Sequence, residues 1–238
     1  MADKMTFQRY EIKYMLSEKQ MKKLQVLIDA YMGTDEYSFA TIRNVYYDTE
    51  SFRLIRRSIE KPAYKEKLRV RSYAPVHGSD SVFVELKKKY EDVVYKRRMS
   101  LPEADVKRCM RSGAPFPADS QIAEEIDYFR SFYGKLVPAV FLSYDRAAYF
   151  GKADHDFRLT VDHNILYRTE NFDLGSAIYG TDLLGKGYYL MEVKTAGGLP
   201  MWLTDFLSEE KIYKTSFSKY GAAYLDMQRN GKEAKRYA

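Results

Sequence analysis

The side chains best suited to chemistry are charged residues that alternate with uncharged ones. In residues 7–16, Arg9, Glu11 and Lys13 occupy every second position, so they share one face if the segment is a strand. Arginine can clamp phosphate oxygens with two parallel hydrogen bonds, lysine supplies a movable positive charge, and glutamate can hold a divalent cation. Together these residue types are suited to binding a highly charged anion and to phosphoryl transfer.

The same alternation recurs in later segments, and basic residues outnumber acidic ones on the charged faces. Beyond residue 16 these faces carry Lys65, Lys67, Arg69, Arg71, Glu85, Lys87, Lys89, Arg146, Arg158, Thr160, Asp162, Glu192 and Lys194. Neighbouring cations on a sheet repel one another, and burying them without partners is very costly. If these faces enclose a channel, the channel must hold water or a slender polyanion.

An ordinary sheet with one face in water is the alternative, because it also alternates polar and apolar residues. Two features favour an inward charged face. A solvated face normally mixes Thr, Ser, Gln and both signs of charge, whereas these faces are mainly cationic. In addition, several amphipathic helices need apolar sheet surface to cover. We therefore expect apolar faces that point outward beneath helices.

The elements that must position these residues follow from hydrophobic periodicity and from turn and cap signals. Capping boxes at Ser17–Gln20 and Ser100–Glu103 predict two helix starts, and short connections imply antiparallel strands. We expect strands at about residues 7–16, 41–48, 64–73, 81–90, 93–100, 135–150, 157–161, 165–168 and 188–195. Helices are expected at about residues 18–32, 51–58, 100–110, 120–133, 200–210 and 218–227, with a frayed tail at 228–238.

Length and composition fit one folded domain. The chain has 238 residues, of which 45% are hydrophobic and 15% aromatic, enough to form a buried core. Cys109, the one cysteine, excludes an internal disulfide and a thiolate zinc site. The net charge of +6 favours polyanionic partners. Because the sequence contains neither a long apolar run nor a signal-like N-terminus, we expect a cytoplasmic protein.

Several motifs occur in a fixed order. They are Phe7-Gln8-Arg9-Tyr10-Glu11-Ile12-Lys13-Tyr14, Arg69-Val70-Arg71, Glu85-Leu86-Lys87 with Lys96 beyond it, Tyr144-Asp145-Arg146, Phe157-Arg158-Leu159-Thr160, Met191-Glu192-Val193-Lys194 and Phe217-Ser218-Lys219-Tyr220. In this combination the sequence resembles the triphosphate tunnel metalloenzymes, a CYTH-like superfamily, and within it the VTC domain of polyphosphate polymerases. The resemblance covers roughly residues 5–225.

The resemblance implies an α+β fold in which an antiparallel, closed β-barrel forms a tunnel with a charged interior and helices packed outside. It implies one tunnel domain over residues 1–238, with its core at about 5–227. The implied ligands are ATP, triphosphate and polyphosphate, and the implied cofactor is Mn²⁺ or Mg²⁺. Specific nucleic-acid binding is not expected, and a membrane-protein partner cannot be deduced from the sequence.

The resemblance also assigns roles to individual residues. The implied catalytic residues are Lys87, Arg146, Arg158 and Lys219. The implied phosphate-binding residues are Arg9, Lys13, Lys67, Arg69, Arg71, Lys89, Lys96 and Lys194. The implied metal ligand is Glu192, with Glu11 and Glu85 as supports. These three glutamates also fit the alternative role of counter-ions for neighbouring Lys and Arg.

One departure from the family pattern bears on the activity. Triphosphatase relatives open with Glu-x-Glu-x-Lys, whereas here Arg9 stands in place of the first glutamate. A metal-binding acid is thereby exchanged for a cation, which favours a phosphate conduit over a two-metal hydrolase. The expected function is ATP-dependent polyphosphate polymerisation. The alternatives are a metal-dependent triphosphatase or polyphosphatase and a non-catalytic polyphosphate-binding module.

Overall fold

The structure is a computed structural model that describes residues 10–91 and 93–236, and it combines helices with an antiparallel sheet. The helices are α1 (Glu18–Tyr31), α2 (Arg53–Ile59), α3 (Glu103–Ser112), α4 (Gln121–Tyr133), α5 (Met201–Glu209) and α6 (Lys219–Arg236). The strands are β1 (Tyr10–Ser17), β2 (Met32–Gly33), β3 (Phe39–Asp48), β4 (Tyr64–Ser72), β5 (Ser81–Tyr90), β6 (Val93–Pro102), β7 (Val137–Gly151), β8 (Arg158–Arg168), β9 (Thr181–Asp182), β10 (Tyr188–Thr195) and β11 (Lys214–Thr215).

Hydrogen bonds connect the strands in the order β11-β1-β10-β8-β7-β3-β4-β5-β6, with β2 on β7 and β9 on β8. The strand pairs whose register is defined are antiparallel, as the short connections predicted. The α+β class and the large antiparallel sheet are therefore confirmed. The closed barrel is not confirmed, because over the described residues the order ends at two different strands, β11 and β6.

The chain divides into two compact units. The first unit comprises Met1–Thr41, Tyr144–Ile165 and Leu184–Phe217. The second unit comprises Ile42–Ser143, Leu166–Leu183 and Ser218–Ala238. Each unit has its own buried apolar cluster. The single tunnel domain expected over residues 1–238 stays a prediction.

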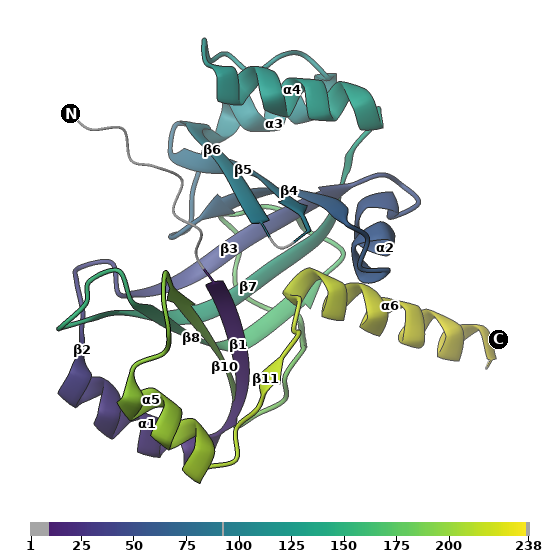
Figure 1. The fold of residues 1–238 in the computed structure, drawn as a ribbon. Coiled ribbons are helices and arrows are strands. Elements are labelled where there is room, and N and C mark those ends of the chain that lie inside the picture. The colour runs from purple at the N-terminus through teal and green to yellow at the C-terminus, as the bar shows by residue number, and fades with distance from the viewer. Residues whose placement is uncertain (1–9, 92, 237–238) are drawn as a thin grey trace. The chain divides into compact units, whose positions relative to one another are not determined.

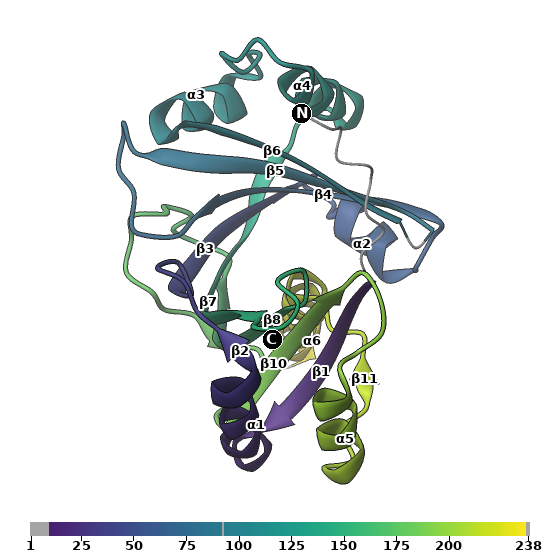
Figure 2. The same ribbon diagram turned by 60° about the vertical axis from the view of Figure 1, so that its left-hand side comes forward.

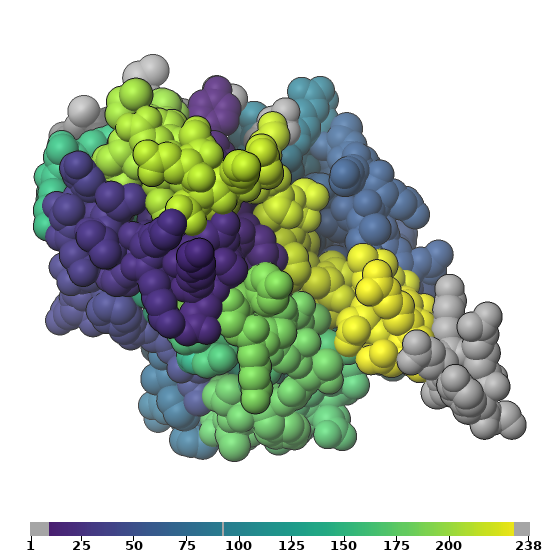
Figure 3. Space-filling model, turned by 90° about the horizontal axis from the view of Figure 1, so that it is seen from below, coloured from purple at the N-terminus to yellow at the C-terminus, as the bar shows by residue number. Residues whose placement is uncertain are grey.

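In the first unit, α1 and α5 cover one face of the β1, β10 and β8 strands (Figure 2). The core between them consists of Tyr14, Leu16, Leu24, Ile28, Met32, Tyr149, Phe157, Leu159, Val161, Met191, Val193, Leu203, Phe206, Leu207 and Ile212. The two helices lie side by side on one surface of this unit (Figure 3), where the Tyr31 and Trp202 rings stack at a centroid distance of 5.1 Å. The uncharged strand faces are therefore the covered ones.

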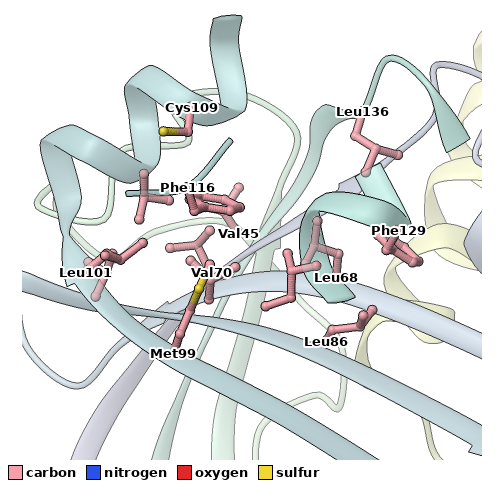
Figure 4. Close-up of a cluster of buried hydrophobic side chains, with 14 of the residues drawn as sticks. Val45, Leu68, Val70, Leu86, Met99, Leu101, Cys109, Phe116, Phe129 and Leu136 are labelled. Atoms are coloured by element: carbon pink, nitrogen blue, oxygen red, sulfur yellow. The ribbon is translucent and has the colours of Figure 1, made fainter. Parts of the chain in front are cut away.

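The second unit repeats this arrangement with different elements. Helices α3 and α4 cover one face of β5 and β6 (Figure 1). Figure 4 shows part of the core between them, where Leu68, Val70 and Leu86 from the sheet meet Phe116 and Phe129. The sequence prediction of apolar faces beneath helices is thus confirmed within each unit.

The two capping boxes had different outcomes. Ser17 caps α1 as predicted: its Oγ accepts from the backbone N–H of Gln20, and the Gln20 side chain accepts from the backbone N–H of Ser17. The box at Ser100 is wrong. Ser100 lies within β6, paired with Phe83, and α3 begins after Pro102 without a side-chain cap. Strand pairing continues to Pro102 and leaves Ser100 too early to cap the helix.

Other element boundaries differ modestly from those predicted. The two strands expected at 157–161 and 165–168 are one strand, β8. The strand continues through Asn164, although this residue adopts the left-handed conformation (φ 48°). Helix α6 extends to Arg236, beyond the predicted end at residue 227. In the part of the chain that the structure describes, no helix is long and apolar enough to span a membrane.

Candidate functional site

The charged face of the first unit arises from the antiparallel register of β1, β10 and β8. Lys13 lies opposite Glu192, and Glu11 lies opposite Lys194. On the other side of β10, Glu192 lies opposite Thr160. We call Glu11, Lys13, Arg146, Asp162, Glu192 and Lys194 the mixed cluster, because acids and bases alternate across its strands.

Glu192 is the centre of the mixed cluster. Its carboxylate oxygens lie 3.5 Å from Lys13 Nζ and 3.1 Å from Lys194 Nζ, and its side chain is only 9% exposed. Lys13 Nζ also lies 3.5 Å from Glu11 Oε1 and donates to the Phe217 carbonyl at 3.1 Å. Burial lowers the pKa of Lys13, but attraction to Glu192 and Glu11 outweighs it and raises the pKa. Lys13 therefore stays protonated at neutral pH.

Arg146 is held rigidly by a carboxylate. Its Nε and one terminal nitrogen donate to the two oxygens of Asp162 at 2.6 and 2.7 Å, and Asp162 is fully buried. Burial lowers the pKa of Arg146, but the neighbouring Tyr144, Asp162 and Glu192 raise it overall. Arg158 is different because it is exposed, with its guanidinium 5.7 Å from the Phe150 ring centre.

The number of carboxylates in the mixed cluster limits the kind of metal ion that could bind there. Among the residues that the structure describes, no group of three or more His, Cys, Asp and Glu side chains could hold a metal ion. The carboxylate oxygens of Glu192 and Glu11 each lie 3.5 Å from Lys13 Nζ. Magnesium is usually bound by one or two carboxylates together with substrate phosphates and water. The donor set therefore fits a hard divalent cation whose remaining ligands come from a phosphate substrate.

The charged face of the second unit spans β4, β5 and β6. In the register of these strands, Lys67 lies opposite Lys87, which lies opposite Lys96. We call the residues of this face the cation cluster; they are Lys65, Lys67, Arg69, Arg71, Glu85, Lys87, Lys89, Lys96 and Arg98. The cation cluster therefore contains eight basic residues and one acid, Glu85.

Glu85 is the acid of the cation cluster, and it contacts four cations. Arg69 approaches it at 2.7 Å, Lys96 at 2.6 Å, Arg98 at 3.5 Å and Arg71 at 3.9 Å. Burial raises the pKa of Glu85, but attraction to Arg69, Arg71 and Lys96 outweighs burial and lowers the pKa to about 2. These ion pairs favour the counter-ion interpretation of Glu85 over metal support.

At one end of the cation cluster the neighbours are mainly lysines. Lys65 lies opposite Lys89 in the register of β4 and β5. Burial lowers the pKa of Lys65, and repulsion from Lys89, Lys61 and Lys87 lowers it further. A bound polyanion would relieve this repulsion.

The sequence analysis missed Tyr46, which joins the cation cluster from β3. Its hydroxyl accepts from Arg69 at 3.0 Å, and its ring stacks on Tyr220 at 4.6 Å. Burial raises the pKa of Tyr46, but Arg69, Lys67 and Arg71 lower it to about 8. The sequence contains a signal for Tyr46: Asn44, Tyr46 and Asp48 occupy every second position, so they share one face of the strand. The two-face pattern applied to the other strands would have identified Tyr46 here.

The start of α6 brings a second segment to the cation cluster. Lys67 Nζ donates to Ser218 Oγ at 3.0 Å, and the same oxygen accepts from the backbone N–H of Gly221 at 3.2 Å. Ser218 therefore caps the helix whose first residue is Lys219. The predicted catalytic residue Lys219 therefore directly follows Ser218, which accepts a hydrogen bond from Lys67 of the cation cluster.

Most of the predicted site residues fall into two groups, whereas Arg158 is exposed on β8 and Lys219 is the first residue of α6. Those in the mixed cluster are Glu11, Lys13, Arg146, Glu192 and Lys194. Those in the cation cluster are Lys67, Arg69, Arg71, Glu85, Lys87, Lys89 and Lys96. Arg9 lies outside the described residues. The structure describes these contacts, and the individual roles stay predictions.

A comparison with models of protein families identifies the family of this chain. The family model of the VTC domain matches residues 8–228. The chain belongs to this family. The resemblance noted in the sequence is therefore confirmed, and a VTC domain covers almost the whole chain. No curated protein matches the sequence.

Three solved structures align with most of this chain. A candidate adenylate cyclase from Bacillus halodurans aligns over 87% of this chain and 92% of its own, with 19% sequence identity and a TM-score of 0.54. A second candidate adenylate cyclase, from Vibrio parahaemolyticus, covers 91% of this chain and 97% of its own, with 10% identity and a TM-score of 0.48. The PH1819 protein of Pyrococcus horikoshii covers 92% and 99%, with 12% identity and a TM-score of 0.45. The likeness to the Bacillus halodurans protein, at 19% identity, concerns the fold alone.

Proposed function

We propose that this VTC domain is a polyphosphate polymerase that transfers the γ-phosphate of ATP to a growing polyphosphate chain. The observation that carries the proposal is the cation cluster, in which lysines and arginines crowd around the single carboxylate of Glu85. Such an excess of positive charge on a half-buried sheet face is stabilised by a polyanion. Membership of the family supports a phosphotransferase or triphosphatase that acts on triphosphate-containing substrates such as ATP.

The chemistry requires positioning and charge neutralisation rather than a protein nucleophile. The terminal phosphate of a bound chain attacks the γ-phosphorus of ATP, the bond to the β-phosphate oxygen breaks, and ADP leaves. Arg69 and Arg71 clamp phosphate oxygens, because a guanidinium offers parallel donors at fixed spacing. Lys87, Lys219, Arg146 and Arg158 neutralise the charge on the transferring group, since each is a permanent or readily protonated cation.

The mixed cluster supplies the metal-binding carboxylates in this proposal. Glu192, supported by Glu11, would hold Mn²⁺ or Mg²⁺, and the bound ion would supply Lewis-acid chemistry that neutralises negative charge on the phosphate substrate. Lys13 and Lys194 fix the orientation of the Glu192 carboxylate from two sides. Because the chain offers few carboxylates here, we expect Mn²⁺ to bind much more tightly in the presence of triphosphate than alone, as measured by calorimetric titration.

The sequence analysis adds two elements to the proposal, the first from the family resemblance and the second from the absence of an export signal. The first is the closed tunnel, through which the product chain would leave. The second is a cytoplasmic location, where ATP is available. A crystal structure with bound triphosphate tests the first element, and the location of the tagged protein in cells tests the second.

The central test is incubation of the purified protein with ATP and Mn²⁺. We expect polyphosphate chains that lengthen with time on a gel, together with stoichiometric ADP. Loss of Lys87 (Lys87→Ala) should weaken phosphate binding and slow this growth, whereas Lys135→Ala should leave it unchanged, because Lys135 is exposed and paired with the exposed Glu50. Release of inorganic phosphate without chain growth would instead indicate a triphosphatase or polyphosphatase, and binding without turnover would indicate a binding module.

A further inference from the structure

The cation cluster ends in aromatic side chains at the end opposite Lys65 and Lys89. Tyr73 directly follows β4, two residues beyond Arg71. Its ring lies 5.7 Å from the ring of Phe83 in an edge-on arrangement, and Phe83 is opposite Arg71 in the strand register. The charged face of this sheet is therefore asymmetric, with lysines at one end and aromatic rings at the other.

Arg98 connects the aromatic end to the charged centre. Its guanidinium carbon lies 3.5 Å from the ring centre of Phe83, and one terminal nitrogen donates to the Tyr73 hydroxyl at 3.4 Å. Its Nε lies 3.5 Å from Glu85 Oε1. The guanidinium of Arg71 lies 5.9 Å from the Tyr73 ring on the same face. Tyr73 is thus held in place by residues that also belong to the cation cluster.

The Tyr73 ring remains accessible even though its position is fixed. Tyr73 is 42% exposed, whereas Phe83 is only partly exposed and lies beneath Arg98. The guanidinium carbon of Arg98 lies 5.5 Å from the centre of this ring. An aromatic ring that is held in position and partly exposed offers a stacking surface for a nucleobase, and stacking tolerates any base because every base has a π-face. An inorganic phosphate chain has no group that gains from such a ring. The feature therefore points to a nucleotide.

The spacing along the strand agrees with the dimensions of a nucleotide. Two residues of an antiparallel strand extend ~6.8 Å, so the Cα of Tyr73, which directly follows the end of β4, lies no more than about this distance from the Cα of Arg71. In a nucleoside triphosphate, the ribose separates the α-phosphate from the base over a comparable length. Phosphates held at Arg69 and Arg71 would thus leave the base beside Tyr73.

We propose that Tyr73, supported by Phe83 and Arg98, forms a nucleobase subsite for the nucleoside triphosphate substrate. This inference rests on the proposed function, because it assumes that Arg69 and Arg71 bind the phosphates of that substrate. Stacking on Tyr73 would favour binding of ATP over binding of inorganic triphosphate, which has no base. It also fixes the direction in which the nucleotide lies along β4.

The test compares the affinities of two ligands by calorimetric titration in EDTA, where metal-dependent turnover is suppressed. We expect Tyr73→Ala to weaken ATP binding about tenfold and to leave inorganic triphosphate binding unchanged. Tyr73→Phe should retain the affinity of the wild type for ATP, because the ring is kept. Tyr90→Ala is the matched control, since Tyr90 is also an exposed tyrosine of this sheet, at the far end of β5, and should change neither affinity.

The outcomes separate the subsite from the proposed function. An equal loss for both ligands in Tyr73→Ala would mean that Tyr73 only supports the cations, and no loss for either would mean that no base binds there; both results overturn the subsite. If the wild type binds neither ligand, the proposed function itself fails. Melting temperatures of the variants check that each is folded, so a change in affinity cannot arise from unfolding.

Discussion

The two units share one design but differ in the charge balance of their clusters: acids and bases are equal in number in the mixed cluster, whereas bases predominate in the cation cluster. In each unit, helices cover the apolar face of a short antiparallel sheet and leave the charged face uncovered by that core. On the mixed cluster of the first unit, Glu11, Glu192 and Asp162 alternate with Lys13, Lys194 and Arg146. On the cation cluster of the second unit, Glu85 is the one acid among eight bases.

In the proposed function, this difference favours separate roles for the two clusters. In the mixed cluster, cross-strand ion pairs balance the charges of the acids and bases. Its carboxylates are therefore stabilised even when no metal or phosphate is bound. The cation cluster retains a large excess of positive charge, so it requires an anion to be fully stabilised. We therefore expect substitutions in the first unit to affect turnover most, and substitutions in the second unit to affect phosphate binding and stability.

The largest effect is expected for Glu192→Gln. The carboxamide keeps the shape of Glu192 but removes the charge that would hold Mn²⁺ or Mg²⁺, so turnover should fall about 1,000-fold, corresponding to ~4 kcal/mol of transition-state stabilisation. Triphosphate affinity without metal should be retained or should rise, because repulsion between Glu192 and the anion disappears. Turnover assays with ATP and Mn²⁺, paired with calorimetry, measure both quantities. Glu50→Gln, in an exposed ion pair, is the control. Turnover at the wild-type level in Glu192→Gln would leave Glu192 as a counter-ion.

The next largest effect is expected for Glu85→Gln. Glu85 is 1% exposed and contacts four cations, so loss of its charge should destabilise the fold by ~3 kcal/mol. Triphosphate should restore part of this stability by replacing the missing anion. Urea unfolding with and without triphosphate measures both effects.

The pH dependence of the Glu85 contribution follows from its lowered pKa. Because the pKa is depressed to about 2, the stabilisation by the charged form is present at neutral pH and is lost as pH falls from about 4.5 through about 2. The difference in stability between wild type and Glu85→Gln should shrink over this range. A difference that does not depend on pH would show that the effect does not come from the charge.

A smaller effect is expected from ligand binding and salt. Triphosphate at a hundredfold excess over its dissociation constant should stabilise the wild type by ~2.7 kcal/mol, provided that it binds only the folded state. At a fixed triphosphate concentration, the gain in melting temperature should decrease with added salt, because screening weakens attraction to the cation cluster. Lys87→Ala should reduce the gain. No shift with millimolar triphosphate would contradict the assignment of the second unit as a phosphate-binding surface.

The smallest effect concerns Tyr46. Its pKa is lowered from 10.0 to about 8, so between these pH values the native state binds fewer protons at this group than the unfolded state. Stability of the wild type relative to Tyr46→Phe should therefore rise as pH increases from about 8 to 10. Tyrosinate absorbance should show one early titration that Tyr46→Phe lacks. Bound triphosphate should move this titration to higher pH, because a nearby anion disfavours tyrosinate. An unchanged titration with ligand would place the phosphates away from Tyr46.

Local patterns in the sequence determined much of the architecture. The two-residue period of strands separated Leu68 and Val70 from Arg69 and Arg71 before any tertiary information was used. Capping at Ser17 was also predictable, because it needs only residues three apart in the chain. The ordered motifs identified the family, and the family model confirms it. These features depend on neighbours in sequence, so the sequence alone contains them.

Only the tertiary structure decided which charges meet. Lys13 and Glu192 become neighbours through the register of β1 and β10, and Glu85 gains Lys96 and Arg98 through the register of β5 and β6. Tyr46 enters the cation cluster because β3 pairs with β4. Directly opposed residues on neighbouring strands lie ~5 Å apart, and a shift of one residue would exchange the faces. Register is set by packing across the whole sheet, so local periodicity predicted the charged faces but not the ion pairs within them.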